Sequence, residues 1–256
     1  MNEYLGRAGS VPIDRDAQAI DPGLRKFMLG VYTKMGLGLL WSALLAYAVG
    51  TIPQVTGIVL TAPVVYIVQW GPLAILLGSN FFMRNASPMA SGLLYWSVVT
   101  LMGAGLGVWV YLATSAVGVT TTGGREILVT FEGMAKAFLL TAGAFGALSL
   151  YGYTTKRNLS GLHSMLIMVT FGLVAISLLN FFIFQSGMME VIMQAVTLVV
   201  FSLLVATQTN QLRESYYHLA HDERGQAVMT NFGALNLYIA FVTIFQMLLS
   251  LMSSRN

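Results

Sequence analysis

Seven long apolar runs follow one another along the chain, each bounded by charged residues or by Gly/Pro clusters. The runs cover 28–50, 62–83, 89–113, 135–154, 162–184, 189–209 and 229–251. A helix that rises 1.5 Å per residue needs roughly 20 apolar residues to cross a bilayer core about 30 Å thick. A membrane β-barrel needs short segments of alternating polarity, whereas these runs are apolar on all sides. The pattern therefore predicts an all-α polytopic membrane protein with seven transmembrane helices.

The composition supports a chain that sits in lipid. Of 256 residues, 56% are hydrophobic and 9% are charged, against about 25% charged in an ordinary soluble domain. We expect a polar N-terminal tail at 1–27, a transmembrane domain at 28–251 and a short C-terminal tail at 252–256. The tail contains no apolar segment of the kind found in a cleavable signal peptide, so we expect the first run to remain in the mature protein.

The basic residues between the predicted spans indicate the orientation of the chain. Nine lie on the side of the N-terminus: Arg7, Arg15, Arg25, Lys26, Arg84, Lys156, Arg157, Arg213 and Arg224. Three lie on the other side: Arg125, Lys136 and Arg255. Basic loops are retained in the cytoplasm, which predicts a cytoplasmic N-terminus. Lys34 lies within the first span, about two turns from its start, where its side chain is long enough to reach the cytoplasmic headgroups.

No motif in the sequence indicates an enzyme. The chain has no Gly-x-Ser-x-Gly elbow, no His-Glu-x-x-His pair, no phosphate-binding glycine loop and no cysteine. We therefore expect no catalytic residue, resident cofactor or metal site. The cluster His218, His221, Asp222 and Glu223 is interpreted as a solvated loop, with a surface metal site or proton sensor as the alternative. The net charge of +3 is scattered, so we expect the bilayer, and no nucleic acid, as the partner.

Small residues and one long connection add local detail. Gly103-x-x-x-Gly107 and Gly143-x-x-x-Ala147 each place two small residues on one helix face, which predicts close contacts between helices inside the bundle. The connection at 114–134 contains a turn signal at 120–124, followed by a short strand or interfacial segment at 127–131.

Four stretches carry a resemblance to a known family. They are the run from Ala144 to Ser160 (AFGALSLYGYTTKRNLS), Ser87 to Trp96, Gln208 to Glu214 and Gly233 to Tyr238. The first closely resembles the fourth-helix signature of bacterial members of the Bax-inhibitor, or TMBIM, family. The resemblance implies a seven-helix protein of the inner membrane and, for characterised relatives, a pH-sensitive calcium leak. It also implies links to stress survival, protection against cell death and membrane-protein quality control.

The two aspartates to which the family's calcium leak is attributed have no counterpart here. The flanking residues align Gln208 with the first and Ala240 with the second, and Asn158 replaces a further signature aspartate. Two carboxylates that share a site respond to pH because they resist ionising together. On the last span, Asn236, Ala240 and Thr243 share one helix face. With Gln208, these residues offer calcium in transit only neutral, weak ligands.

Two functional hypotheses follow from the resemblance. The favoured one is a weak or pH-insensitive cation leak lined by the sixth and seventh spans. The alternative is a non-transporting scaffold that binds a membrane protease or other membrane proteins.

Overall fold

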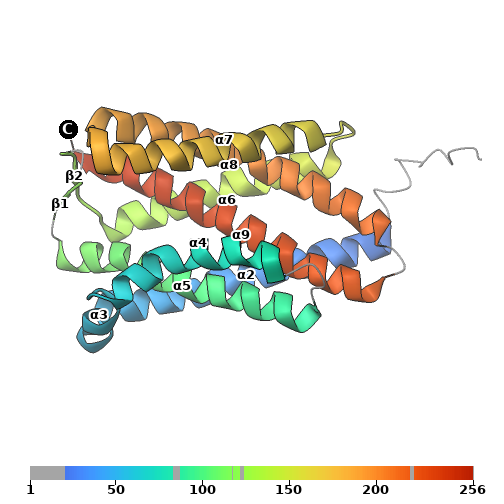
Figure 1. The fold of residues 1–256 in the computed structure, drawn as a ribbon, viewed down its shortest axis with the longest axis horizontal. Coiled ribbons are helices and arrows are strands. Elements are labelled where there is room, and N and C mark those ends of the chain that lie inside the picture. The colour runs from blue at the N-terminus through green and yellow to red at the C-terminus, as the bar shows by residue number, and fades with distance from the viewer. Residues whose placement is uncertain (1–20, 83–86, 117, 122–123, 220–221, 256) are drawn as a thin grey trace, which may run out of the picture.

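The chain forms a bundle of long helices with a small sheet at one end (Figure 1). The computed structural model describes residues 21–82, 87–116, 118–121, 124–219 and 222–255. The helices are α2 (Pro22–Thr51), α3 (Pro53–Val59), α4 (Val64–Phe82), α5 (Pro88–Ser115), α6 (Phe131–Thr154), α7 (Ser160–Leu179), the π-helix η2 (Asn180–Phe184), α8 (Gly187–His218) and α9 (Glu223–Ser253). The strands are β1 (Val119–Thr120), β2 (Glu126–Ile127) and β3 (Ser254–Arg255).

The helices confirm the predicted all-α membrane fold. Six are long and apolar enough to cross a bilayer, and α3 with α4 forms a seventh, broken span bent by 63°. Three helices extend well beyond the predicted runs: α2 begins at Pro22, α9 begins at Glu223, and α8 continues to His218. Hydropathy identifies only the part of a helix that lies in lipid, so it does not predict the polar helical turns beyond the bilayer.

The starts of four helices follow from local capping. The side chains of Asp21, Ser87, Thr130 and Ser186 accept hydrogen bonds from backbone N–H groups in the first turns of α2, α5, α6 and α8. Such caps satisfy donors that have no partner within the helix. Pro22 and Pro88 follow two of these caps, at a position where proline sacrifices no helical hydrogen bond.

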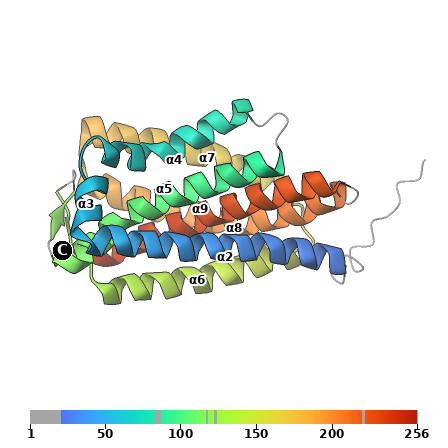
Figure 2. The same ribbon diagram turned by 90° about the horizontal axis from the view of Figure 1, so that it is seen from below.

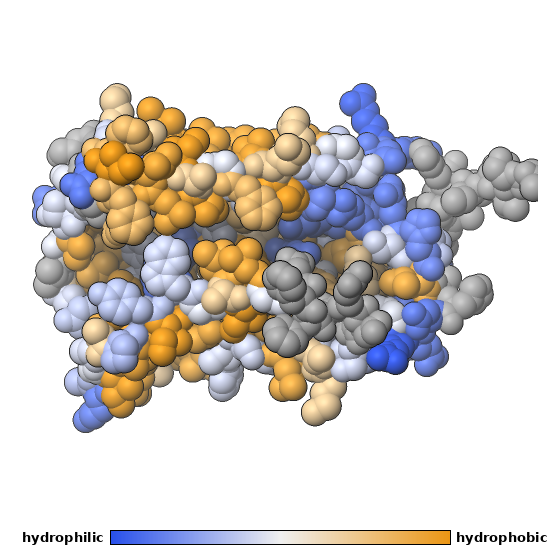
Figure 3. Space-filling view, in the orientation of Figure 1, coloured by the Kyte–Doolittle hydropathy of each residue, from blue (hydrophilic) through white to orange (hydrophobic). Residues whose placement is uncertain are grey.

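Apolar side chains cover most of the long face seen in Figure 3, and hydrophilic ones gather towards the two ends of the bundle. The beginning of α2 and strand β3 lie at opposite ends, as an odd number of crossings requires (Figures 1 and 2). This face of the bundle therefore presents an apolar band to the membrane, which the hydropathy pattern predicts.

The close contact predicted at Gly103 and Gly107 is confirmed. Both glycines of α5 face α2: a Cβ atom on Gly103 would lie 2.7 Å from the Cα of Ser42. A Cβ atom on Gly107 would lie 2.5 Å from the Cβ of Val49. Only glycine allows the two backbones to approach this closely.

The contact predicted at Gly143 and Ala147 is wrong. Both residues are exposed on α6, and a Cβ atom on Gly143 would meet nothing within 4 Å. The packed face of α6 is a different one, formed by Ala137, Thr141, Phe145, Ser149 and Gly152. The spacing of small residues identifies a helix face, and the tertiary fold decides whether that face is covered.

The connection between α5 and α6 forms a hairpin that pairs with the C-terminal strand. Thr120 pairs with Glu126 between antiparallel β1 and β2, and β3 adds to β2. Gly124 has a φ of +80° at the turn. The predicted strand at 127–131 is confirmed only in part, because β2 ends at Ile127 and Phe131 already begins α6. The sheet lies at the end of the bundle opposite to the start of α2 (Figure 1).

Candidate functional site

Gln208 and Ala240 lie on adjacent antiparallel helices, α8 and α9. A Cβ atom on Gly233 of α9 would lie 2.4 Å from a methyl carbon of Leu212 on α8, which fixes the register of the pair. From this contact, Gln208 is four residues and Ala240 seven residues further towards the sheet end. The difference of three residues corresponds to about 4.5 Å along the helix axes. The two positions are therefore at similar depth in the membrane.

The side chain of Gln208 lies in a buried polar segment. Its Oε1 atom is buried without a hydrogen-bond partner. The two flanking threonines are bonded to other helices: His163 Nδ1 of α7 lies 3.1 Å from Thr207 Oγ1, and Tyr32 Oη of α2 lies 3.4 Å from Thr209 Oγ1. An unpartnered amide oxygen in a low-dielectric interior is an acceptor available to a cation or a water molecule.

The three positions on α9 are placed in different environments. Ala240 is 1% exposed and belongs to the main apolar core, Thr243 is half-buried, and Asn236 is exposed. The structure thus places Gln208 and Ala240 inside the bundle, whereas Asn236 lies at its surface.

A polar cluster near the sheet end was not predicted from the sequence. Arg125, which follows the hairpin turn, lies 3.5 Å from the carboxylate of Glu190 and donates to Gln194 at 3.2 Å. Thr121 donates to the other carboxylate oxygen of Glu190 at 2.9 Å. The side chains of Arg125 and Glu190 are 12% and 21% exposed, so this pair is more protected than a surface ion pair. Arg125 and Glu190 are 65 positions apart in the sequence, and the fold brings them into contact.

Cavities of about 300, 310 and 540 Å³ penetrate the bundle, and the largest begins at this cluster. It extends between α4, α5, α8 and α9 to Ile239, the neighbour of Ala240. Its polar wall is formed by Gln69, Thr121, Glu190, Gln194, Gln246 and Ser250. The cavity therefore runs from the polar cluster near the sheet end to Ile239.

The opposite half of the bundle is closed by packed and hydrogen-bonded side chains. Lys34, which is predicted to reach the headgroups, donates from its Nζ atom to Asn231 Oδ1, and this atom lies 5.4 Å from the centre of the Tyr95 ring. Asn231 in turn donates to Ser91 at 2.7 Å, which ties α2, α5 and α9 together. Tyr95 and Tyr238 are fully buried in the same region.

Comparison with known proteins assigns the family. The family model described as "Inhibitor of apoptosis-promoting Bax1" matches residues 24–256. The chain belongs to this Bax-inhibitor family. It is 40% identical to an uncharacterized protein of Caulobacter vibrioides, over 98% of this chain and 97% of that protein. It is 32% identical to the inner membrane protein YbhL of Escherichia coli, over 91% of this chain and 93% of YbhL. An uncharacterized protein of Rickettsia prowazekii is 30% identical, with 93% of each chain covered.

In this Bax-inhibitor protein, acidic side chains on the described parts of the spanning helices lie only towards the helix ends. They are Glu132, Glu190, Glu214 and Glu223. Within the described residues no group of three or more His, Asp or Glu could hold a metal ion. His218 ends α8, and His221, its partner in the predicted loop cluster, lies outside the described residues.

Replacing Arg125 of this Bax-inhibitor protein by leucine is expected to destabilise the fold by about 1–3 kcal/mol, because the half-buried carboxylate of Glu190 loses its cation. The double variant Arg125→Leu with Glu190→Leu should recover much of the loss, because no charge is then left unpaired. Thermal unfolding in detergent measures both. An Arg125→Leu variant as stable as the parent protein would show that the pair does not hold the hairpin in place.

Proposed function

We propose that this protein is a weak cation leak of the bacterial inner membrane whose flux does not respond to pH. The family gives the starting point, and the name of YbhL supports the inner membrane. The observation that carries the proposal is the cavity of about 540 Å³ that has one polar wall and reaches Ile239, next to Ala240. A cation that enters it passes the carboxylate of Glu190 and the side-chain oxygens of three glutamines.

The closed half of the bundle accounts for a weak leak. Beyond Ala240, the path towards the start of α2 is blocked by Tyr95, Tyr238 and the bonds between Lys34, Asn231 and Ser91. Conduction requires these contacts to open, and the ammonium group of Lys34 repels a cation near the far end. Calcium prefers several oxygen ligands that include carboxylates, so Gln208 alone holds it poorly.

The absence of a pH response follows from the residues at the two family positions. Glutamine and alanine do not titrate, so the acid couple implied by the family is missing. Around Gln208, the titratable groups bonded to its neighbours are His163 of α7 and Tyr32 of α2. An imidazole is the kind of side chain whose charge responds to pH near neutrality. Its hydrogen bond to Thr207 is the one route for a residual pH effect among the described contacts of this segment.

Calcium flux into dye-loaded liposomes at about pH 6 and pH 8 tests the proposal. We expect flux above that of protein-free liposomes and equal rates at the two pH values. The variant His163→Gln serves as the control that removes the remaining imidazole. A several-fold rise in flux at the higher pH that persists in this variant would contradict the proposal, as would the absence of any flux.

A membrane scaffold is the second candidate, favoured by the uncovered small-residue face of α6. A Cβ atom added to Gly143 or Gly146 would meet nothing within 4 Å, and Ala147 is exposed. Such a face allows another helix to approach closely. Flux equal to protein-free liposomes, together with recovery of a membrane protease cross-linked through Ala147→Cys, would favour this role over the leak.

A further inference from the structure

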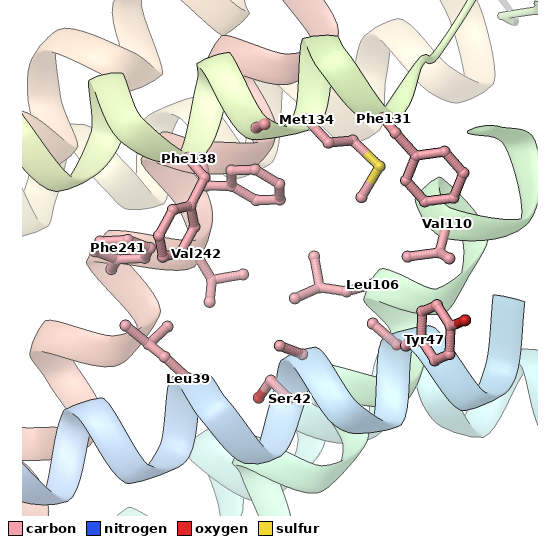
Figure 4. A pocket seen from close by; sticks show the side chains of 14 residues that line it. Leu39, Ser42, Tyr47, Leu106, Val110, Phe131, Met134, Phe138, Phe241 and Val242 are labelled. Atoms are coloured by element: carbon pink, nitrogen blue, oxygen red, sulfur yellow. The ribbon is translucent and has the colours of Figure 1, made fainter. Parts of the chain in front are cut away.

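An apolar groove separates α2 from α6 on the side of the bundle that faces lipid. α2 packs mainly on α5 and α9, and α6 packs on α8 and α9, so the two helices frame a gap (Figure 2). The groove has a volume of about 310 Å³ and contains side chains from α2, α5, α6 and α9 (Figure 4). Its floor is formed by Leu106 and Val110 of α5 and by Phe241, Val242 and Phe245 of α9.

The groove has almost no group that could bind water. The hydroxyl of Ser42, the polar atom nearest its floor, is already bonded to Tyr238 Oη at 2.7 Å and lies 3.3 Å from the carbonyl oxygen of Val99. An ordered water molecule needs several polar partners, and apolar cavities of this kind remain dry. A dry, empty groove would leave its wall atoms without the dispersion contacts they have elsewhere. An apolar occupant is therefore favoured.

The rim of the groove favours a flexible chain over a second protein helix. Three partly exposed aromatic rings line the groove (Figure 4): Tyr47 of α2 and Phe131 and Phe138 of α6, of which Phe138 packs edge-to-face on Phe241. Helices that associate in membranes need small residues that allow their backbones to come close, and these rings prevent it. The exposed face around the opening continues into the lipid-facing belt through Leu44 and Leu139.

We propose that the groove between α2 and α6 is a binding site for the acyl chain of a membrane lipid. The bilayer supplies such chains in contact with the open side of the groove, and the apolar floor gives them contacts on all remaining sides. The bound chain lies against Phe241 and Val242, which directly follow Ala240 on α9. The site is independent of ion conduction and does not rest on the proposed leak.

Photo-crosslinking with a phospholipid that carries a diazirine near the end of its acyl chain tests the site. Vesicles of phosphatidylethanolamine and phosphatidylglycerol that contain this probe are irradiated, and the labelled residues are mapped by mass spectrometry. We expect label on Val242 and Phe241, which are 1% and 5% exposed and are reached through the groove. Label confined to outward side chains such as Phe182 would overturn the proposal.

Two filling variants and one matched control complete the test. Ala43→Phe on α2 and Ala135→Phe on α6 place a ring in the groove from opposite walls, at exposed positions. Each should reduce the labelling of Val242 several-fold relative to Phe182. Gly172→Phe adds the same ring to the exposed face of α7, where a Cβ atom meets nothing within 4 Å, and should leave the labelling unchanged.

Two further outcomes would overturn the assignment. Unchanged labelling of Val242 in both filling variants would mean that the probe reaches α9 by another route. Disulfide-linked dimers formed through Ala135→Cys would mean that a second copy covers the groove, a result made readable by the absence of native cysteine.

Discussion

Gly152→Ala is expected to destabilise the bundle by about 3 kcal/mol or more, at the high end of the cost of overpacking. Gly152 of α6 packs directly on the backbone of α8, where a Cβ atom would lie 2.2 Å from the carbonyl oxygen of Ala206. That atom cannot rotate away as a flexible side chain could, so the two helices must separate. The separation also breaks the hydrogen bond of 3.4 Å from Asn210 Nδ2 to the carbonyl oxygen of Gly152.

Gly143→Ala provides the matched control on the same helix. Its Cβ atom meets no neighbour within 4 Å, so the stability should stay equal or rise by up to about 1 kcal/mol from the better helix propensity of alanine. Thermal unfolding of both variants in the same detergent compares them directly. Equal melting temperatures for the two variants would mean that α6 and α8 are not in this close contact.

The contrast between these two glycines shows what the sequence reveals about packing. Hydropathy predicted the spans because the cost of placing polar groups in lipid can be read from the residues of each segment, without knowledge of the tertiary fold. The packed face of α6 required tertiary information, since Gly143 and Gly152 are equally small and lie on the same predicted span. A signal that could have indicated the face is the spacing of Thr141, Phe145, Ser149 and Gly152, because residues four, four and three positions apart lie on one side of a helix.

The polar contacts that close the bundle were harder to predict for the same reason. Lys34 is long enough to reach the headgroups, so the sequence alone favoured the cheaper exposure of its charge. The fold instead offers an acceptor on α9, Asn231, almost two hundred positions away in the chain. Arg125 was assigned to the side opposite the N-terminus, but its contact with Glu190 depends on how the hairpin folds over α8.

At the candidate site, sequence and structure supply different parts of the argument. The flanking residues align Gln208 and Ala240 with the two aspartates of the family. The register of α8 and α9 puts these two residues at similar depth. The spacing on α9 grouped Asn236 and Thr243 with Ala240, yet Asn236 is exposed. Helical periodicity describes direction around an axis, whereas burial also depends on where the neighbouring helices end.

The double variant Gln208→Asp with Ala240→Asp is expected to give the protein a calcium flux that rises several-fold as the pH increases. The two introduced carboxylates would lie at similar depth, about 4.5 Å apart along the helix axes. Two acids that share a site resist ionising together, so the second proton leaves only at higher pH, and the double variant tests whether these two positions share one. The added negative charge then attracts a divalent cation at the inner end of the polar cavity near Ile239.

The neutral pair Gln208→Asn with Ala240→Asn is the control for this experiment, because it matches the size of the aspartates without their charge. Its flux should be the same at about pH 6 and pH 8. Each single aspartate variant should show a smaller pH response than the double variant. A His163→Gln background removes the imidazole bonded to Thr207 from the comparison. If the folded double aspartate variant shows no pH response in liposomes, the two positions do not share a site on a conducting path. The wild-type flux is measured separately, so that result would not contradict a pH-insensitive leak in the wild-type protein. It would contradict only the inference that positions 208 and 240 form one site between α8 and α9.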